Sequence, residues 1–232
     1  MIDILIPVLN RPARAEPLVR NIKKTTKESH HILFLCSLND EEEIQACIAT
    51  GEDVCVMTHE AGPADFAKKI NAGYRHTEGD FVQIGADDLR FHKGWEREAL
   101  KFADTAGVIG TNDLHNPRVK RGYHSTHPLI SRAYIEIWNG TFDHTGEIFC
   151  ELYDHQYVDD ELSQTAQLRD NWVFAKDSHV EHLHPYFGDA EMDATYEKAL
   201  AKSREDYRLF QIRLRKMRRA VARDVRMRAR AR

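Results

Sequence analysis

The chain has 232 residues and a formal net charge of −4 at pH 7, a length that suits one large domain or one domain with an appendage. Hydrophobic residues make up 42% of it, enough for a buried core, yet no apolar run approaches the roughly 20 residues of a membrane-spanning helix. Charge is uneven: residues 207–232 hold eleven Lys and Arg and one acid, a net +10, which leaves −14 elsewhere.

The N-terminus and the cysteines indicate the compartment. The apolar stretch MIDILIPVLNRP is short, contains Asp3, and lacks both a basic segment and a small-residue cleavage site. It therefore predicts a first strand rather than a signal peptide. No two cysteines form a CxxC pair, and we expect reduced thiols in a cytoplasmic protein; the four are Cys36, Cys47, Cys55 and Cys150.

Strand-like and helix-like segments alternate along the first half of the chain. Apolar runs predict strands, and amphipathic segments predict helices between them. We expect strands over residues 2–10, 31–36, 53–57, 81–84 and 106–110, and helices over 13–24, from Glu41, and over 65–75 and 95–105. This alternation predicts an α/β fold with a mostly parallel central sheet covered by helices on both faces.

The second half is less regular. Residues 115–157 are rich in loops, with a short strand running into a helix over 129–138. A helix over 158–168 and a strand over 172–180 follow, and one long helix is expected from Ala194 to about Arg228. Its apolar stripe is expected to pack on the body or on a partner helix up to about Leu214; the stripe comprises Leu200, Ser203, Tyr207, Phe210, Leu214, Met217, Val221 and Val225.

Polar residues gather where the predicted strands end. In FVQIGADDLRFHKGW, a buried strand stops at the adjacent carboxylates Asp87 and Asp88. Two like charges there are costly unless a cation or a donor compensates them, although a simple turn and helix cap is the ordinary alternative. Asn10, Arg11 and Ser37 also follow strands, and ligands of parallel sheets bind at this edge. The convergence favours a binding site.

Other motifs narrow the chemistry. The chain has neither GxGxxG after its first strand nor GxxxxGK[ST], which argues against a dinucleotide fold and a P-loop. In HVEHLHP, His182 and His184 would point the same way from an extended segment and His179 the other way. A zinc site of three histidines is an alternative, but the chain lacks a helical HExxH.

Four stretches in order resemble GT-A glycosyltransferases, in particular the family 2-like enzymes of bacteria and phages: IPVLNRP, GPADFAKKINAGYRHTEGDFVQIGADDL, YVDDEL and HVEHLHP. The resemblance covers roughly Ile2 to Pro185 and implies a UDP- or GDP-sugar donor. It implies that the donor-binding residues are Pro7, Val8, Asn10, Arg11, Ser37, Asp65, Lys69, Asp87 and Asp88. Ser37 stands where the family commonly keeps an acid.

The resemblance also implies a divalent cation, Mn²⁺ or Mg²⁺, on the donor diphosphate. The family's DxD motif here reads Gly85-Ala86-Asp87, so the first Asp is missing, and Asp88 would assist Asp87. His182 and His184 match the late histidine that completes the metal shell. A hard cation takes oxygen ligands from carboxylates and phosphates, which would offset the repulsion between the two acids.

YVDDEL carries the implied general base. Asp160 matches the acid that many inverting members use, and Asp159 is the alternative one residue away. Acids in the first turn of a helix also simply suit its dipole. The expected reaction is metal-dependent transfer of a hexosyl or pentosyl group, with inversion.

The acceptor is the least determined partner. PRVKRGYH supplies the candidate acceptor-binding residues Arg118, Lys120, Arg121, Tyr123 and His124, and the C-terminal helix is basic. We expect residues 1–190 to form the transferase domain and 191–232 a basic helical extension, which could instead be a solvated arm. A modified base in phage DNA is favoured over a surface glycan, lipid-linked or protein acceptor, since the helix lacks Trp or Phe after Phe210.

Two other classes remain open. A catalytically inactive GT-A-like module that binds nucleic acid would account for the missing first Asp and for Ser37. A sugar nucleotidyltransferase would need a glycine-rich first loop, and LNRPAR has no glycine.

Overall fold

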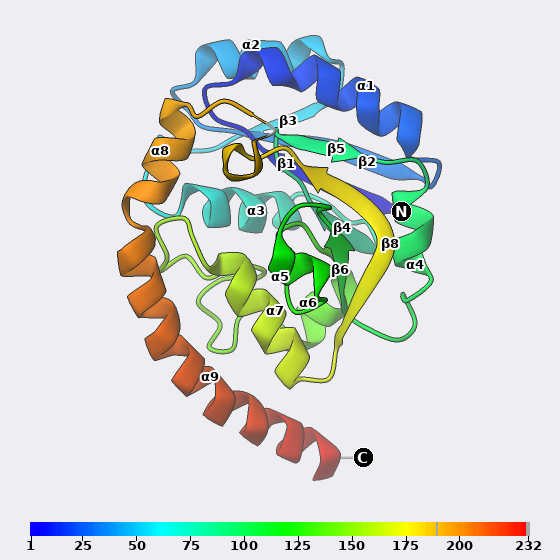
Figure 1. Cartoon of the computed structure of the whole chain (residues 1–232), viewed down its shortest axis with the longest axis vertical. Coiled ribbons are helices and arrows are strands. Elements are labelled where there is room, and N and C mark those ends of the chain that lie inside the picture. The colour runs from blue at the N-terminus through cyan, green and yellow to red at the C-terminus, as the bar shows by residue number, and fades with distance from the viewer. Residues whose placement is uncertain (189, 231–232) are drawn as a thin grey trace.

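The computed structural model describes residues 1–188 and 190–230, the last nine of these as backbone only. Across these residues eight strands form one sheet (Figure 1). They are β1 (Ile2–Pro7), β2 (His30–Cys36), β3 (Asp53–Val56), β4 (Phe81–Ile84), β5 (Leu89–Phe91), β6 (Val108–Asn112), β7 (Leu129–Ser131) and β8 (Trp172–His182).

The strand order is β3-β2-β1-β4-β7-β6-β8-β5. Strands β3, β2, β1 and β4 are parallel, as are β6 and β8, whereas β7 and β5 run antiparallel to their neighbours. The carboxyl ends of β1 and β4 therefore meet at one edge of the sheet, where the predicted polar residues begin.

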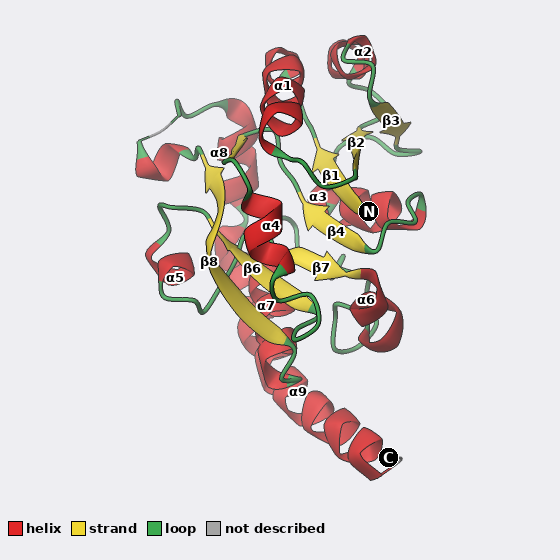
Figure 2. Ribbon diagram, turned by 90° about the vertical axis from the view of Figure 1, so that its right-hand side faces the viewer, coloured by secondary structure: helices red, strands yellow, loops and turns green. Residues whose placement is uncertain are grey.

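Helices cover both faces of the sheet, as expected (Figure 2). Successive β1 side chains point to opposite faces, so Ile4 packs in the cluster that includes Leu18, and Leu5 in the one that includes Ile70. The first cluster lies under α1 (Ala15–Thr25), α2 (Glu41–Ala49) and α4 (Trp95–Leu100). The second lies under α3 (Asp65–Arg75), α6 (Arg132–Trp138) and α7 (Val158–Leu168).

The predicted bounds of α3, β4 and α7 agree with the structure residue for residue. Strand β5 and the short helix α5 (Pro117–Lys120) were not predicted, nor were the 3₁₀ turns Pro12–Arg14 and Pro185–Phe187. Strand β5 lies inside the FVQIGADDLRFHKGW stretch and pairs with the end of β8. That pairing brings the histidine segment next to the two carboxylates.

The prediction of a single long C-terminal helix was wrong. Helix α8 (Ala194–Ala201) ends at Lys202, whose backbone leaves the helical region, and α9 (Ser203–Arg230) begins after it. The two helices are held by different parts of the body. The Tyr196 hydroxyl of α8 reaches Asp88, whereas Asp206 of α9 accepts backbone hydrogen bonds from residues 154–156.

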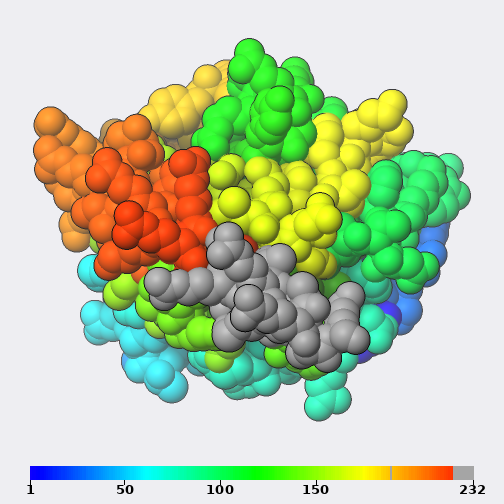
Figure 3. Space-filling view, turned by 90° about the horizontal axis from the view of Figure 1, so that it is seen from below, coloured from blue at the N-terminus to red at the C-terminus, as the bar shows by residue number. Residues whose placement is uncertain are grey.

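Helix α9 packs on the body over a longer stretch than its sequence suggested. Phe210 joins the cluster under α7, and beyond Leu214 both Met217 and Val221 are buried with Phe142. Figure 3 shows the orange and red surface of α9 against the yellow surface formed by α7 and the start of β8. The side chain of Val225 lies outside the described residues.

The remaining global features are simple. The four cysteines are free thiols, and Cys36, Cys47 and Cys150 are buried. Among the described residues, no helix combines the length and apolar character that crossing a bilayer requires.

Candidate functional site

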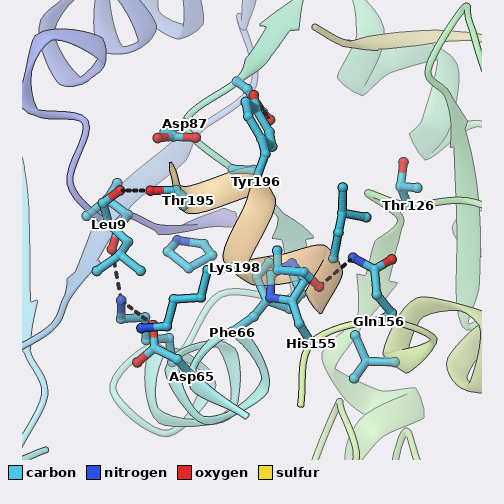
Figure 4. A pocket seen from close by; sticks show the side chains of 18 of the residues that line it. Leu9, Asp65, Phe66, Asp87, Thr126, His155, Gln156, Thr195, Tyr196 and Lys198 are labelled. Carbon is cyan, nitrogen blue, oxygen red and sulfur yellow. Dashed lines mark hydrogen bonds and ion pairs between the residues drawn. The ribbon is translucent and has the colours of Figure 1, made fainter. Parts of the chain in front are cut away.

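A cavity of about 250 Å³ opens at the carboxyl ends of β1 and β4. Figure 4 shows Asp87 and Tyr196 on one side of it, with Asp65, Phe66 and His155 across from them. Ten predicted residues line it: Pro7, Val8, Arg11, Asp65, Lys69, Asp87, Asp88, Asp159, His182 and His184. The predicted residues outside its lining are Asn10, Ser37, Asp160, Arg118, Lys120, Arg121, Tyr123 and His124.

The turn after β1 is held by acids of α2. Asn10 adopts a positive φ of 56°, a conformation that Asn tolerates better than most residues. Its N–H donates to Asp40 over 2.7 Å, and the N–H of Arg11 donates to Glu43 over 2.5 Å. Both acids were missed, although the run NDEEE offered them, and the predicted Ser37 is fully buried beside them.

Lys69 joins α3 to the end of β1. Its side chain is 1% exposed, and its ammonium donates to the carbonyl oxygen of Val8 over 2.8 Å. The same ammonium lies 2.7 Å from the Asp65 carboxylate, one helical turn earlier. Lys69 therefore shapes the cavity wall, and its charge is already compensated by Asp65.

The carboxylate pair is split between two sets of partners. Asp87 accepts from the guanidinium groups of Arg11, over 3.0 Å, and Arg14, over 3.4 Å. Asp88 accepts from the Tyr196 hydroxyl over 2.8 Å and lies 3.3 Å from the His182 ring. One oxygen of each acid, Asp87 Oδ2 and Asp88 Oδ1, is buried without a hydrogen-bond partner among the described residues.

The pKa values of the two acids shift in opposite directions. Burial, together with the charge of Asp88, raises the pKa of Asp87 to about 7. Burial also opposes ionisation of Asp88, but His182 and Tyr196 outweigh it and hold the pKa of Asp88 below its usual range. Burial, then the charge of His182, lowers the pKa of His184 to about 4, so that ring is a neutral imidazole, and its Nδ1 accepts the backbone N–H of Tyr186 over 3.2 Å.

Helix α8 closes one side of the cavity. Asp193, its N-cap, accepts two hydrogen bonds of 2.9 Å from the guanidinium of Arg11. The same guanidinium lies 3.8 Å from the centre of the Tyr196 ring. These residues were missed, as was Arg14, because they fall outside the motifs; only the cap pattern of Asp193 signalled a helix start there.

The two acids of YVDDEL point in different directions. Asp159 lines the cavity, and its Oδ2 lies 3.1 Å from Nε2 of the buried His124. Asp160 instead forms an ion pair with Arg118 of α5. His124, Asp159 and Asp160 place ligand atoms within 4.8 Å of one another, close enough to share a cation, but Arg118 already pairs with Asp160.

The predicted acceptor residues form an exposed basic surface, except for one. The side chain of Arg118 is 53% exposed, and Lys120, Arg121 and Tyr123 are exposed too. His124 is only 2% exposed. Its contacts are with the protein interior, beside Asp159.

Residues 3–160 match the sequence family described as Glycosyl transferase family 2. A search of curated proteins finds no significant match. The mannosyltransferase PcManGT from Pyrobaculum calidifontis, solved in complex with GDP-Man and Mn²⁺, is similar, with a TM-score of 0.60 at 15% identity; the match covers 95% of this chain and 72% of that one.

Two further solved structures are similar. S. aureus TarS 1-349 in complex with UDP-GlcNAc gives a TM-score of 0.56 at 14% identity; the match covers 85% of this chain and 64% of that one. Glucosyl-3-phosphoglycerate synthase from Mycobacterium tuberculosis in complex with phosphoglyceric acid gives 0.57 at 14%, over 89% of this chain and 77% of that one. These likenesses show the GT-A fold that the motifs predicted.

Proposed function

The chain belongs to glycosyl transferase family 2, and from this premise we propose that it transfers a sugar from a nucleoside-diphosphate donor to an acceptor hydroxyl with the help of a divalent cation. The observation that carries the proposal is the buried pair Asp87 and Asp88 at the cavity, each with one oxygen that has no hydrogen-bond partner within the described part of the chain. Two buried carboxylates of this kind are stable only when positive charge compensates them.

The residues present fit a divalent cation. The free oxygens of Asp87 and Asp88 are hard ligands of the kind that Mn²⁺ and Mg²⁺ take. The neutral ring of His184 would join them by giving up the hydrogen bond that its Nδ1 accepts from Tyr186. His182, which lies 3.3 Å from Asp88, would hold that acid in place or ligate the cation itself. When bound, the cation would neutralise the diphosphate and stabilise it as a leaving group.

The cavity supports a phosphate site next to the acids. Arg11 already binds a carboxylate, Asp193, through two hydrogen bonds, and a diphosphate oxygen pair would use the same fork. Opposite, Phe66 and His155 lie with ring centroids 5.6 Å apart near Asp65, and these flat rings suit the nucleoside. Two of the similar solved structures are complexes with GDP-Man and UDP-GlcNAc, which supports a GDP- or UDP-sugar donor.

Asp159 is proposed as the general base in preference to Asp160, because Asp159 lines the cavity whereas Asp160 is paired with Arg118. In the proposed step the acceptor hydroxyl gives its proton to Asp159 while its oxygen bonds to the anomeric carbon. The bond from that carbon to the diphosphate breaks, and the diphosphate leaves with the electron pair. Attack opposite the leaving group inverts the anomeric configuration.

The acceptor proposal follows the charge around the site. The exposed Arg118, Lys120, Arg121 and Tyr123 favour an acceptor that carries phosphates, and a modified base in phage DNA is the proposal that the sequence favoured. The competing acceptors are a surface glycan, a lipid-linked molecule or a protein. The competing class of protein is an inactive module that binds nucleic acid. The cytoplasmic location stays a prediction, supported by the four free thiols.

Turnover can be tested before the acceptor is known. The protein is incubated with UDP- and GDP-sugars and Mn²⁺, and release of nucleoside diphosphate to water is followed with and without duplex and single-stranded DNA. We expect slow release that requires Mn²⁺, is lost in Asp88→Asn, and accelerates with the true acceptor. Release that continues in Asp88→Asn and with a chelator would contradict the metal-dependent reaction.

A further inference from the structure

Both oxygens of the Asp159 carboxylate are held by the protein. Oδ1 accepts the backbone N–H of Asp160 over 3.0 Å, and Oδ2 lies 3.1 Å from Nε2 of His124. The side chain of His124 is 2% exposed, whereas that of Asp159 is 22% exposed and lines the cavity. The imidazole therefore approaches the carboxylate from the interior and leaves its other side open to a substrate.

The turn that carries His124 is tied to the sheet, in addition to the hydrogen bond of 2.9 Å that Gln167 of α7 donates to the carbonyl oxygen of Tyr123. Ser125 Oγ accepts the N–H of Thr111 over 3.1 Å and donates to the carbonyl oxygen of Thr111 over 3.2 Å, which ties the turn to β6. On the other side, the indole of Trp172 in β8 donates to the carbonyl oxygen of Gly122 over 3.1 Å. His124 is thus anchored to the sheet and holds the first turn of α7 from outside that helix.

Resting on the proposed role of Asp159 as general base, we propose that His124 is a positioning residue for the transfer reaction. Its Nε2–H holds Asp159 Oδ2 so that the remaining lone pairs of the carboxylate face the cavity, where the acceptor hydroxyl would lie. A base must sit within hydrogen-bond reach of the proton that it takes, so this orientation acts directly on the rate.

The charges around the pair agree with this geometry. Burial disfavours charge on both groups, yet the nearby Asp159 raises the pKa of His124 and His124 lowers the pKa of Asp159. On neighbouring elements, Asp160 raises and Arg118 lowers the pKa of His124. His127, His155 and His182 also interact electrostatically with Asp159. Each group therefore favours the charged form of the other, an imidazolium beside a carboxylate.

Two substitutions separate the hydrogen bond from the charge. His124→Gln retains an N–H donor near the Nε2 position without a charge, and His124→Ala removes both. We expect His124→Ala to lower kcat about 10- to 100-fold with the donor KM unchanged, because the base is misplaced while the donor site is intact. His124→Gln should recover most of that kcat at high pH.

The dependence of kcat on pH tests the effect of His124 on the pKa of Asp159. Because the imidazolium lowers the pKa of Asp159, its loss raises that pKa, and the acidic limb of kcat against pH should move to higher pH in both variants. His31→Gln is the matched control, since His31 pairs with Asp3 and Asp53 at the amino end of β2, away from the cavity. It should leave kcat and the acidic limb unchanged.

Three results would overturn the proposal. Loss of kcat in His124→Gln equal to that in His124→Ala, with an unmoved acidic limb, would leave His124 a purely structural role. Loss of a bound Mn²⁺ in His124→Gln would assign His124, Asp159 and Asp160 to a cation instead. Near-normal turnover in Asp159→Asn would remove the base on which the proposal rests.

A measurement without turnover distinguishes the proposal from the proposed function. The pKa of the His124 ring, followed by NMR titration, should fall in Asp159→Asn because the ring loses its anionic partner. If the pKa of His124 falls in Asp159→Asn but the protein binds no nucleotide sugar, the proposed function is refuted and the pairing of His124 with Asp159 stands. A ring whose pKa is the same in both proteins would refute the pair itself.

Discussion

Gly85 explains at the residue scale why this chain departs from the DxD pattern. A Cβ at this position would lie 2.6 Å from the carbonyl oxygen of Leu5, so an Asp there would clash with the backbone of β1. The first acid of the DxD pattern therefore has no room at this position. The sequence revealed that the first Asp was missing, but only the packing of β4 on β1 shows that no side chain fits.

Asp159 and Asp160 are adjacent in the sequence, and sequence reasoning favoured Asp160 as the base. The direction of each side chain depends on where α7 begins, and Tyr157 before it adopts a positive φ of 70°, which nothing in YVDDEL signals. The ion pair between Arg118 and Asp160 likewise depends on an unpredicted helix, α5. Tertiary contacts, not the sequence, are therefore the ground for proposing Asp159.

We predict that Asp159→Asn lowers the rate of sugar transfer by about 10²- to 10⁴-fold, the usual contribution of a general base. Donor binding should be retained, because among the described residues Asp159 makes no hydrogen bond or ion pair with Asp87 or Arg11. Asp160→Asn is the matched control, expected to lose less activity and some stability through its Arg118 pair. Single-turnover transfer and donor titration check this, and the reverse ranking of the two variants would restore Asp160 as the base.

The raised pKa of Asp87, about 7, predicts a pH dependence of metal binding. A cation that needs the ionised carboxylate displaces a proton below that pKa, so affinity should rise about tenfold per pH unit there. Mn²⁺ should therefore bind more tightly at about pH 8 than at about pH 6, as measured by calorimetric titration. In Asp87→Asn the residual binding should lose most of this dependence. Equal affinities for the natural protein at both pH values would argue against Asp87 as a ligand.

At the scale of elements, the segments with strong local signals were predicted best. Helices α3 and α7 and strand β4 have clear periodicity and flanking turns, and their bounds were right. Strand β5 has only three residues and exists because β8 pairs with it, so no local pattern marks it. The break at Lys202 was hidden by an apolar stripe that continues across it, while the anchors of α8 and α9 lie far away in the chain.

Arg213 shows that α9 supports the helix that carries the proposed base. Its side chain is 4% exposed and pairs with Glu161 of α7 and with Asp143. Removing one partner of a buried ion pair costs about 3–5 kcal/mol, so Arg213→Ala should lower the free energy of unfolding by that amount. Arg215, on the exposed face of the same helix, is the control, with an effect within about 0.5 kcal/mol. Urea unfolding of both variants measures this; equal effects would contradict the supporting role of α9.

At the scale of the whole molecule, the C-terminal segment is part of the site as well as a carrier of charge. Residues of α8 line the cavity, and Asp206 of α9 accepts the backbone N–H groups of residues 154–156, which lead into α7. The division into residues 1–190 and 191–232 remains a prediction about folding units. The charge asymmetry was visible in the sequence, but the dependence of the cavity on α8 was not.

Two truncations separate packing from charge. Ending the chain after Val221 keeps Met217 and Val221 against Phe142 and removes the five arginines of residues 222–232. If these arginines bind DNA phosphates, the affinity for DNA should fall in the truncated protein. The slope of log K against the logarithm of the salt concentration should become less negative by about 0.9 per lost phosphate contact. Fluorescence anisotropy over a salt series measures both quantities. An unchanged salt slope would take this segment out of the DNA-acceptor proposal.

The second truncation, which ends the chain after Leu214 and so removes more of α9, is the comparison. It also removes the buried Met217 and Val221, which contribute about 1.5–3 kcal/mol each, and it should lower the melting temperature. If both truncations melted alike, Met217 and Val221 would contribute nothing to the fold.

The proposed metal-dependent nucleotide-sugar site is tested most directly by a thermal-shift panel of UDP-, GDP-, CMP- and TDP-sugars, each with and without Mn²⁺. The panel is run on the natural protein, on Asp88→Asn and on Asp177→Asn, an exposed control. A ligand at 100 times its Kd adds about 2.7 kcal/mol to native stability, which is readily seen as a shift. We expect the sugars of one nucleotide to raise the melting temperature, only with Mn²⁺, in the natural protein and in Asp177→Asn but not in Asp88→Asn. No shift with any nucleotide sugar, or an equal shift in Asp88→Asn, would contradict the proposed site.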